Sequence, residues 1–193
     1  MKTAEHPAAV VKYLRVLVVA LCSISYIQAQ SLPNENIIFW DIKAVLPEAQ
    51  LLDIKAIDEE GNHYDVKALQ DSYDSSLLSV KALVNGQTLP VKMIVKKGDQ
   101  YYPVKAIDDE GRILDVKAIG EDGELLDVKG VSKMGSIIDI RAIDKEQRQY
   151  NVISISPKEG VNHVKGLKMF SEEVEAVIHG IKIVAHVKSL RQY

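Results

Sequence analysis

The stretch ILDVKAI at residues 113–119 returns after a short turn as LLDVKGV at residues 125–131. Variants of these seven residues recur along the chain at a spacing close to twelve, at 39–45, 51–57, 63–69, 77–83, 88–94, 101–107, 137–143, 149–155 and 161–167. A fixed repeat indicates a fold built from one supersecondary unit. Each unit is rich in Val, Ile and Leu, and acidic, often Gly-containing turns separate the units. These features predict β-strands joined as hairpins in an all-β protein.

The turn between the two quoted strands ends in Gly123, which fits a three-residue hairpin loop closed by a left-handed glycine. If this glycine fixes the register, Lys117 faces Asp127 and Asp115 faces Lys129. The same rule gives the facing pairs Lys55 with Asp65, Asp53 with Lys67, and Lys129 with Asp139. Opposite charges across antiparallel strands stabilise the pairing by roughly 0.2–1 kcal/mol each. The charges therefore favour an antiparallel meander, because the alternative, a β-solenoid with twelve-residue coils, would stack like charges.

Side chains alternate between the two faces of a strand. Leu126, Val128 and Gly130 form a wholly apolar face, which we expect in the core. The Asp and Lys residues form the other face, expected as a partly solvated surface that fixes the register, or as a charged seam. About thirteen strands exceed what an open twisted sheet usually holds. We therefore predict that the meander curls into a barrel or a two-layer sandwich.

Several segments depart from the repeat. Residues 70–76 form a longer polar gap, predicted to be a flexible or contacting loop. Pro90 and Pro103 replace the Asp of the repeat, so their strands should be edges or the missing N–H should face away from a partner. Asn85-Gly86 predicts a two-residue hairpin turn. Residues 174–190 predict a final hairpin with His179-Gly180 as its turn, and Ser171 is a second-choice start for a short helix.

The N-terminal residues 1–29 have the features of a secretory signal peptide. Lys2, Lys12 and Arg15 precede an apolar run over residues 16–27, and Ala29 offers a small residue at the cleavage site. The alternative is an N-terminal membrane anchor, but the apolar run is short for a spanning helix. We predict an unstructured leader over 30–36 and a single repetitive domain over 37–193. The exported chain would then contain no transmembrane span.

Export also changes the charge and the thiol content. The full chain has a net charge of −3, and residues 1–29 contain three basic side chains and one acidic, so their removal leaves −5. An acidic chain disfavours nucleic acid or an anionic lipid surface as the partner. Cys22 is the only cysteine and leaves with the signal, so the mature chain has no disulfide and no cysteine-based metal site.

The chain shows no pattern typical of catalysis. No Gly-x-Ser-x-Gly motif or Gly-rich phosphate loop is present, and His63, His163, His179 and His186 are not at the spacing of a zinc protease. The acidic turns lack the alternating Asp spacing of dedicated calcium loops. We therefore predict no catalytic, cofactor-binding or metal-binding residues, no cofactor, and no enzymatic activity.

The repeated Asp-Val-Lys-Ala-Ile units, the segment Gln28-Ala29-Gln30 and the closing residues 181–190 resemble a family of uncharacterised secreted repeat proteins from Bacteroidetes-type bacteria. The resemblance covers nearly the whole mature chain and implies export in a Gram-negative cell, with no activity to carry over. The leading hypothesis is a periplasmic or cell-surface protein that acts as an interaction or structural module, with an envelope protein or a glycan as partner. The alternatives are a small-ligand carrier and a hydrolase with a cryptic site among His163, His179 and His186.

Overall fold

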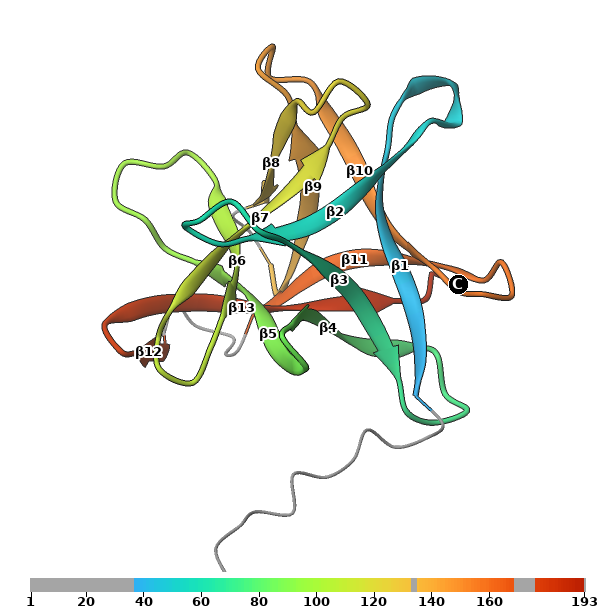
Figure 1. Ribbon diagram of the computed structural model, residues 1–193, viewed down its shortest axis with the longest axis horizontal. Helices are drawn as coiled ribbons and strands as arrows, with labels where there is room; N and C mark the ends of the chain where they lie inside the picture. The colour runs from blue at the N-terminus through green and yellow to red at the C-terminus, as the bar shows by residue number, and fades with distance from the viewer. Residues whose placement is uncertain (1–36, 133–134, 169–175, 193) are drawn as a thin grey trace, which may run out of the picture. The chain divides into compact units, whose positions relative to one another are not determined.

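The computed structural model describes residues 37–132, 135–168 and 176–192, and these residues form thirteen β-strands (Figure 1). The strands are β1 Ile38–Val45, β2 Leu51–Ile57, β3 His63–Gln70, β4 Leu77–Val84, β5 Gln87–Ile94, β6 Tyr102–Ile107, β7 Ile113–Ile119, β8 Leu125–Gly130, β9 Ile137–Ile143, β10 Gln149–Ile155, β11 Val161–Lys168, β12 Ala176–Ile178 and β13 Ile181–Leu190. The short 3-10 turn Pro47–Ala49 joins β1 to β2. In these three ranges, no helix is long and apolar enough to cross a membrane. The all-β prediction is confirmed.

Every strand pairing in these ranges is antiparallel, and the pairings follow a simple plan. Twelve strands form four groups of three, and within each group every strand pairs with the other two: β1–β2–β3, β4–β5–β13, β6–β7–β8 and β9–β10–β11. One further pairing joins each group to each other group. We call each group a junction. The sheet thus closes on itself as a barrel, and the alternative of a parallel solenoid is wrong.

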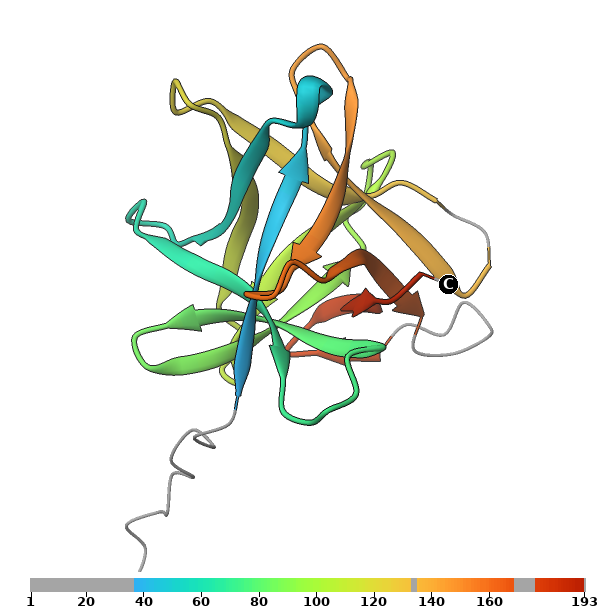
Figure 2. The ribbon, with the colours of Figure 1, turned by 90° about the vertical axis from the view of Figure 1, so that its right-hand side faces the viewer.

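The three strands of a junction run in different directions, as comparison of Figures 1 and 2 shows. Each strand bends at its centre, pairing with one junction partner through its first half and with the other through its second half. The glycine rule therefore holds only for the half of a hairpin next to the turn. Lys117 faces Asp127 and Lys55 faces Asp65, as predicted.

Beyond the strand centre the predicted register is wrong. Asp115 faces Lys105 on β6 rather than Lys129, and Asp53 faces Lys43 on β1 rather than Lys67. Lys129 faces Arg141 rather than Asp139. In the first two cases the hairpin strands separate at their centres, and each takes a third strand as its next partner. In the third case β8 and β9 stay paired from Asp127 to Gly130, in a register shifted by two residues from the predicted one.

The β1–β2–β3 junction shows what the charged face of the repeat does. Three ion pairs link its strands in a cycle, Lys43 to Asp53, Lys55 to Asp65 and Lys67 to Asp41. The three lysine side chains are 23–27% exposed and the three aspartates 45–54% exposed. The Asp/Lys face is therefore the outer surface of the barrel, and its charges form a partly exposed seam at the junction.

These ion pairs predict a loss of stability in acid. The hydrogen bond from Lys43 lowers the pKa of Asp53, and those from Lys55 and Lys165 lower the pKa of Asp65 and Asp139. A carboxyl whose pKa is lower in the folded state contributes stability above its unfolded pKa, and loses it as the pH falls through the folded value. We expect the free energy of unfolding, measured with urea, to fall as the pH is lowered from about 5 to about 2.

Asp53→Asn provides the comparison for this acid effect. The variant should be less stable than the parent chain at pH 6, and the difference between the two should shrink at pH 3. A difference that stays constant with pH would show that the carboxylate charge contributes nothing.

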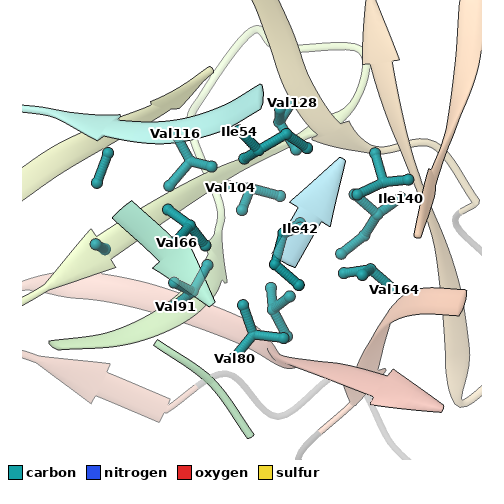
Figure 3. Close-up of a cluster of buried hydrophobic side chains, with 14 of the residues drawn as sticks. Ile42, Ile54, Val66, Val80, Val91, Val104, Val116, Val128, Ile140 and Val164 are labelled. Atoms are coloured by element: carbon teal, nitrogen blue, oxygen red, sulfur yellow. The ribbon is translucent and has the colours of Figure 1, made fainter. Parts of the chain in front are cut away.

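The inward face supplies the core. The residue between the Asp and the Lys of each unit points into the barrel, where Figure 3 shows these side chains together: Ile42, Ile54, Val66, Val80, Val91, Val104, Val116, Val128, Ile140 and Val164. Two residues further on, a fully buried small side chain faces a large one on the next strand. In the β1–β2–β3 junction, Ala44 faces Leu52, Ala56 faces Tyr64 and Ala68 faces Trp40. Each junction is thus filled by small side chains matched with large ones.

The β4–β5–β13 junction reverses this match at one place. Met93 occupies a small-residue position of β5, and it faces Ala185 on β13 where the other strands carry a larger side chain. Glycine replaces alanine at Gly130 and Gly166, and a Cβ at Gly166 would lie 2.6 Å from Sδ of Met93. The extra length of Met93 is therefore accommodated by two glycines from other junctions.

Pro90 and Pro103 are not on edge strands, so that part of the proline prediction is wrong. Pro90 faces Lys81 on β4, and the pairing of β5 with β6 begins only at Val91. Pro103 faces Lys129 on β8, and the pairings of β6 with β5 and β7 also begin after it. Each proline thus lies where its strand is paired on one side only.

The hairpin turns use the predicted residues. Asn85 and Gly86 have φ of 49° and 80° between β4 and β5, as a two-residue turn with both residues left-handed requires. His179 and Gly180, with φ of 48° and 81°, make the equivalent turn between β12 and β13. Residues 174–175, the helix start at Ser171, the leader and the signal segment lie outside the described residues.

Candidate functional site

A cleft of about 890 Å³ opens beside the start of β1. It is lined by β1, by the polar gap between β3 and β4, by the turn between β10 and β11, and by Arg191 after the end of β13. We call it the β1 cleft. The polar gap over 70–76, predicted from the sequence to be a flexible or contacting loop, supplies Gln70, Tyr73 and Ser75 to the wall.

The walls of the β1 cleft are largely apolar and open to solvent. Ile38, Phe39, Tyr73 and Val161 are all among the exposed large hydrophobic residues, and Tyr73 is fully exposed. Ile38 and Phe39 are the first two residues of β1 and precede the buried Trp40. A group of exposed apolar side chains around one hollow is typical of a binding surface.

Trp40 anchors the inner wall of the cleft. Its indole Nε1 donates to Oε1 of Gln70 at 2.9 Å, and Nε2 of Gln70 donates to the carbonyl oxygen of Ser72 at 2.9 Å. These two bonds tie the loop carrying Tyr73 to the barrel. On the opposite side, a Cβ at Gly160 would lie 3.3 Å from the Trp40 ring, so glycine allows the β10–β11 turn to lie close against the indole.

The floor of the cleft is a buried polar cluster. Asn162 is 2% exposed and its Nδ2 donates to the carbonyl oxygen of Ser75 at 2.7 Å and to Oγ of Ser189 at 3.1 Å. The hydroxyls of Ser189 and Ser154 are 2.7 Å apart and share a hydrogen bond. Most other repeat units carry large apolar or aromatic residues where Asn162 lies and alanine where the serines lie. Polar side chains therefore take the place of apolar ones where the β1 cleft meets the core.

Charge at the β1 cleft is of one sign. Lys158 and Arg191 are the charged residues lining it within the described part of the chain, and both are exposed. Asp74 lies nearby without lining the cleft. Its pKa is lowered by the backbone hydrogen bond from Ser76 and by the charge of Arg191. The cleft therefore combines apolar walls, amide groups and a cationic rim.

The four histidines considered as candidates do not form a site. His63 begins β3, His179 lies in the β12–β13 turn, and His163 and His186 lie on the outer faces of β11 and β13. Burial, reinforced by nearby lysines, lowers the pKa of both strand histidines. Among the described residues no histidine is hydrogen-bonded to a carboxylate, and no group of three or more metal-ligating side chains occurs.

Residues 36–190 match the model of a family described as "Family of unknown function (DUF7486)". The chain belongs to this family. The match includes all thirteen strands and every residue of the β1 cleft except Arg191. No curated protein matches the chain. No solved structure matches it either.

Proposed function

We propose that this protein is an exported, non-enzymatic binding protein that holds its partner in the β1 cleft. The observation that carries the proposal is the cleft itself, which places exposed aromatic and aliphatic side chains around a hollow of about 890 Å³ on a closed, rigid barrel. Exposed apolar residues around a hollow with a few polar groups are typical of interaction sites and ligand-binding grooves.

The chemistry of the cleft favours a protein segment with apolar side chains and a carboxylate. Phe39 and Tyr73 offer aromatic surface, Ile38 and Val161 offer aliphatic surface, and Arg191 offers a planar group that binds carboxylates through two hydrogen bonds. Aromatic residues and arginine carry much of the energy at protein interfaces. A glycan needs aromatic faces and hydrogen-bonding groups more than aliphatic ones, so the mixed wall favours the protein partner.

Tyr73→Ala should weaken partner binding by about tenfold, or ~1.4 kcal/mol, because it removes exposed aromatic surface without disturbing the core. A photo-reactive amino acid placed at position 73 identifies the partner by cross-linking in cells. Titration of the purified partner against the parent chain and the Tyr73→Ala variant then measures the loss of affinity.

Ile137→Ala is the matched control, because Ile137 is also exposed and lies outside the β1 cleft. Cross-links should form from position 73 and not from position 137. Equal cross-linking from both positions, or equal affinity of the two alanine variants and the parent, would contradict the proposed role of the cleft.

A small-ligand carrier is the second candidate, and the size of the cleft favours it. Small-molecule sites in proteins measure roughly 300–1,000 Å³. The barrel interior is filled by side chains, so a ligand would occupy the β1 cleft rather than the centre. Native mass spectrometry of the protein purified from its own cells would detect a bound ligand of defined mass, which Tyr73→Ala should release.

Export is the remaining part of the proposal. The positive n-region, the short apolar run and Ala29 support cleavage after Ala29 and delivery to the periplasm or the cell surface. N-terminal sequencing of the mature protein should give Gln30 as the first residue, in the periplasmic or surface fraction. A mature chain that retains Met1 in the cytoplasm would contradict this prediction.

A further inference from the structure

The four junctions of the barrel share one geometry but differ in charge. In each junction, one strand's residue just before its central inward-pointing residue faces another strand's residue just after its own central inward-pointing residue. The β1–β2–β3 junction fills these positions with three aspartates and three lysines. The β6–β7–β8 junction keeps two of the aspartates, and ion pairs join Lys105 to Asp115 and Lys117 to Asp127. The β9–β10–β11 junction keeps Asp139, which pairs with Lys165 at 2.6 Å and Arg141 at 3.3 Å.

The β4–β5–β13 junction keeps all three lysines and has lost all three carboxylates. Lys188 faces Ser79, Lys92 faces His186, and Lys81 faces Pro90. Serine, histidine and proline thus occupy the places where the repeat has aspartate. No carboxylate remains at the six positions of this junction, all of which are described, so its three cations have no counter-charge of their own.

Two of the three lysines contact the residues that replace the aspartates. Nζ of Lys188 donates to Oγ of Ser79 at 2.9 Å, and Nζ of Lys92 is hydrogen-bonded to Nδ1 of His186. Each of the three lysine residues is partly buried.

The pKa values of these lysines reflect the missing carboxylates. Burial, with the charge of Lys188, lowers the pKa of Lys81, and burial with the charges of Lys81 and Lys188 lowers the pKa of Lys92. The equivalent Lys67 is also desolvated, but the hydrogen bond from its ammonium to Asp41 raises its pKa overall. The same fold position therefore favours the charged lysine where an anion is present and disfavours it where none is.

The surroundings add little negative charge. Asp109 is near enough to oppose the lowering of the Lys81 pKa, but no ion pair joins the two side chains. Lys67 and Lys165 face Lys81 and Lys188 from the neighbouring junctions, and each is already paired with its own aspartate, Asp41 and Asp139. The balance around the three lysines is strongly positive.

We propose that the β4–β5–β13 junction is a binding site for a phosphate-type oxyanion, held by Lys81, Lys92 and Lys188 with the hydroxyl of Ser79. The other junctions show that this geometry places an anionic oxygen within reach of the lysines, because their aspartates occupy that space. Here Ser79, Pro90 and His186 stand at those positions, so the negative charge that the aspartates supply elsewhere would come from an external anion. Lysine ammonium groups act as point charges toward phosphate, and a neighbouring hydroxyl supplies a further donor.

Ser79→Asp is the sharpest test, because it restores the residue that the repeat itself carries and so should fold. Isothermal titration with inorganic phosphate, and with a sugar phosphate monoester as a second probe, measures binding to the parent chain and the variant. We expect Ser79→Asp to lower the affinity for both probes by at least about tenfold. Binding of the monoester alone would assign the site to a phosphorylated molecule, and binding of both would assign it to the phosphate group as such.

Asn151→Asp is the control of equal charge, since it adds a carboxylate at the same position of the β9–β10–β11 junction, beside Arg141. This variant should bind phosphate as the parent does. Lys92→Met, which removes a cation without adding an acid, should also weaken binding. The proposal is overturned if the parent chain binds neither probe, or if Asn151→Asp weakens binding as much as Ser79→Asp. These outcomes do not involve the β1 cleft, so they test the oxyanion site alone.

Discussion

Met93→Ala should lower the free energy of unfolding by about 2–5 kcal/mol, as expected for a long buried side chain truncated in a packed core. Met93 is fully buried and is the largest side chain at any of the small-residue positions. Its end lies against Gly130 and Gly166, whose missing Cβ atoms leave the space that it fills. Truncation therefore opens a cavity bounded by three junctions rather than one.

Adding volume next to Met93 should also lower the stability of the protein. Gly166→Ala should destabilise the protein by about 1–3 kcal/mol, because the new methyl group overlaps the end of Met93. In the Met93→Ala background the same methyl group enters the cavity. The double variant should then be more stable than the sum of the two single losses predicts.

Urea denaturation of the parent, both single variants and the double variant completes this thermodynamic cycle. Gly123→Ala is not a suitable control, because the left-handed φ of Gly123 adds backbone strain of its own. Val128→Ala is a better one, since it truncates a buried side chain that is not among the nearest neighbours of a Cβ at Gly130 or Gly166. Additive effects in the Met93–Gly166 cycle would show that the two residues do not share one space.

Asn162→Leu should cost about 1–3 kcal/mol, although leucine is the residue that several repeat units carry at this position. The change removes the amide that donates to the carbonyl oxygen of Ser75 and to Ser189. The partly buried carbonyl oxygen of Ser75 and the buried hydroxyl of Ser189 then lose this donor, and the loop beside the β1 cleft loses its link to the core. Leaving a buried polar group without a hydrogen-bond partner costs more free energy than a typical hydrogen bond contributes to stability.

The loss should be partly reversed by making the rest of the cluster apolar as well. Ser154→Ala and Ser189→Ala, combined with Asn162→Leu, return the junction to the composition of the repeat and leave only Ser75 without its donor. Thermal denaturation followed by circular dichroism compares the single, double and triple variants. A triple variant that is less stable than Asn162→Leu alone would contradict this account of the cluster.

The strands and most turns could be predicted from the sequence, because both depend on local patterns. Seven-residue apolar units predict strands, and Asn85-Gly86 and Gly123 predict the turns that join them. The register near each turn follows from the turn glycine, as Lys117 and Asp127 show. The register beyond the strand centre does not, since Asp115 pairs with Lys105 from the preceding hairpin for reasons of three-dimensional closure. A pairwise rule cannot describe a sheet in which every strand of the barrel has three partners.

Of the candidate sites, only the loop over 70–76 could be predicted from the sequence, for a related reason. A repeat directs attention to what its units share, whereas both sites consist of positions where the units differ. Asn162 and Ser189 depart from an apolar pattern, and Ser79 and His186 depart from an acidic one. Those departures are visible in the sequence, but only the pairing of β4 with β13 and of β11 with β13 brings them together. The exposed residues of the β1 cleft likewise come from four separate segments.

The pairing of β1 with β10 has a consequence for the order of folding. Lys43 faces Ile153, so the first strand of the barrel needs a partner that lies more than half the chain away. Each hairpin can form as soon as its own residues are available. The β1–β2–β3 and β9–β10–β11 junctions, by contrast, are joined to each other through the β1–β10 pairing, which needs β10. Non-local contacts of this kind slow folding. We therefore expect refolding in two phases, in which hairpin formation is fast and closure of the barrel through the β1–β10 and β4–β13 pairings is the slow step.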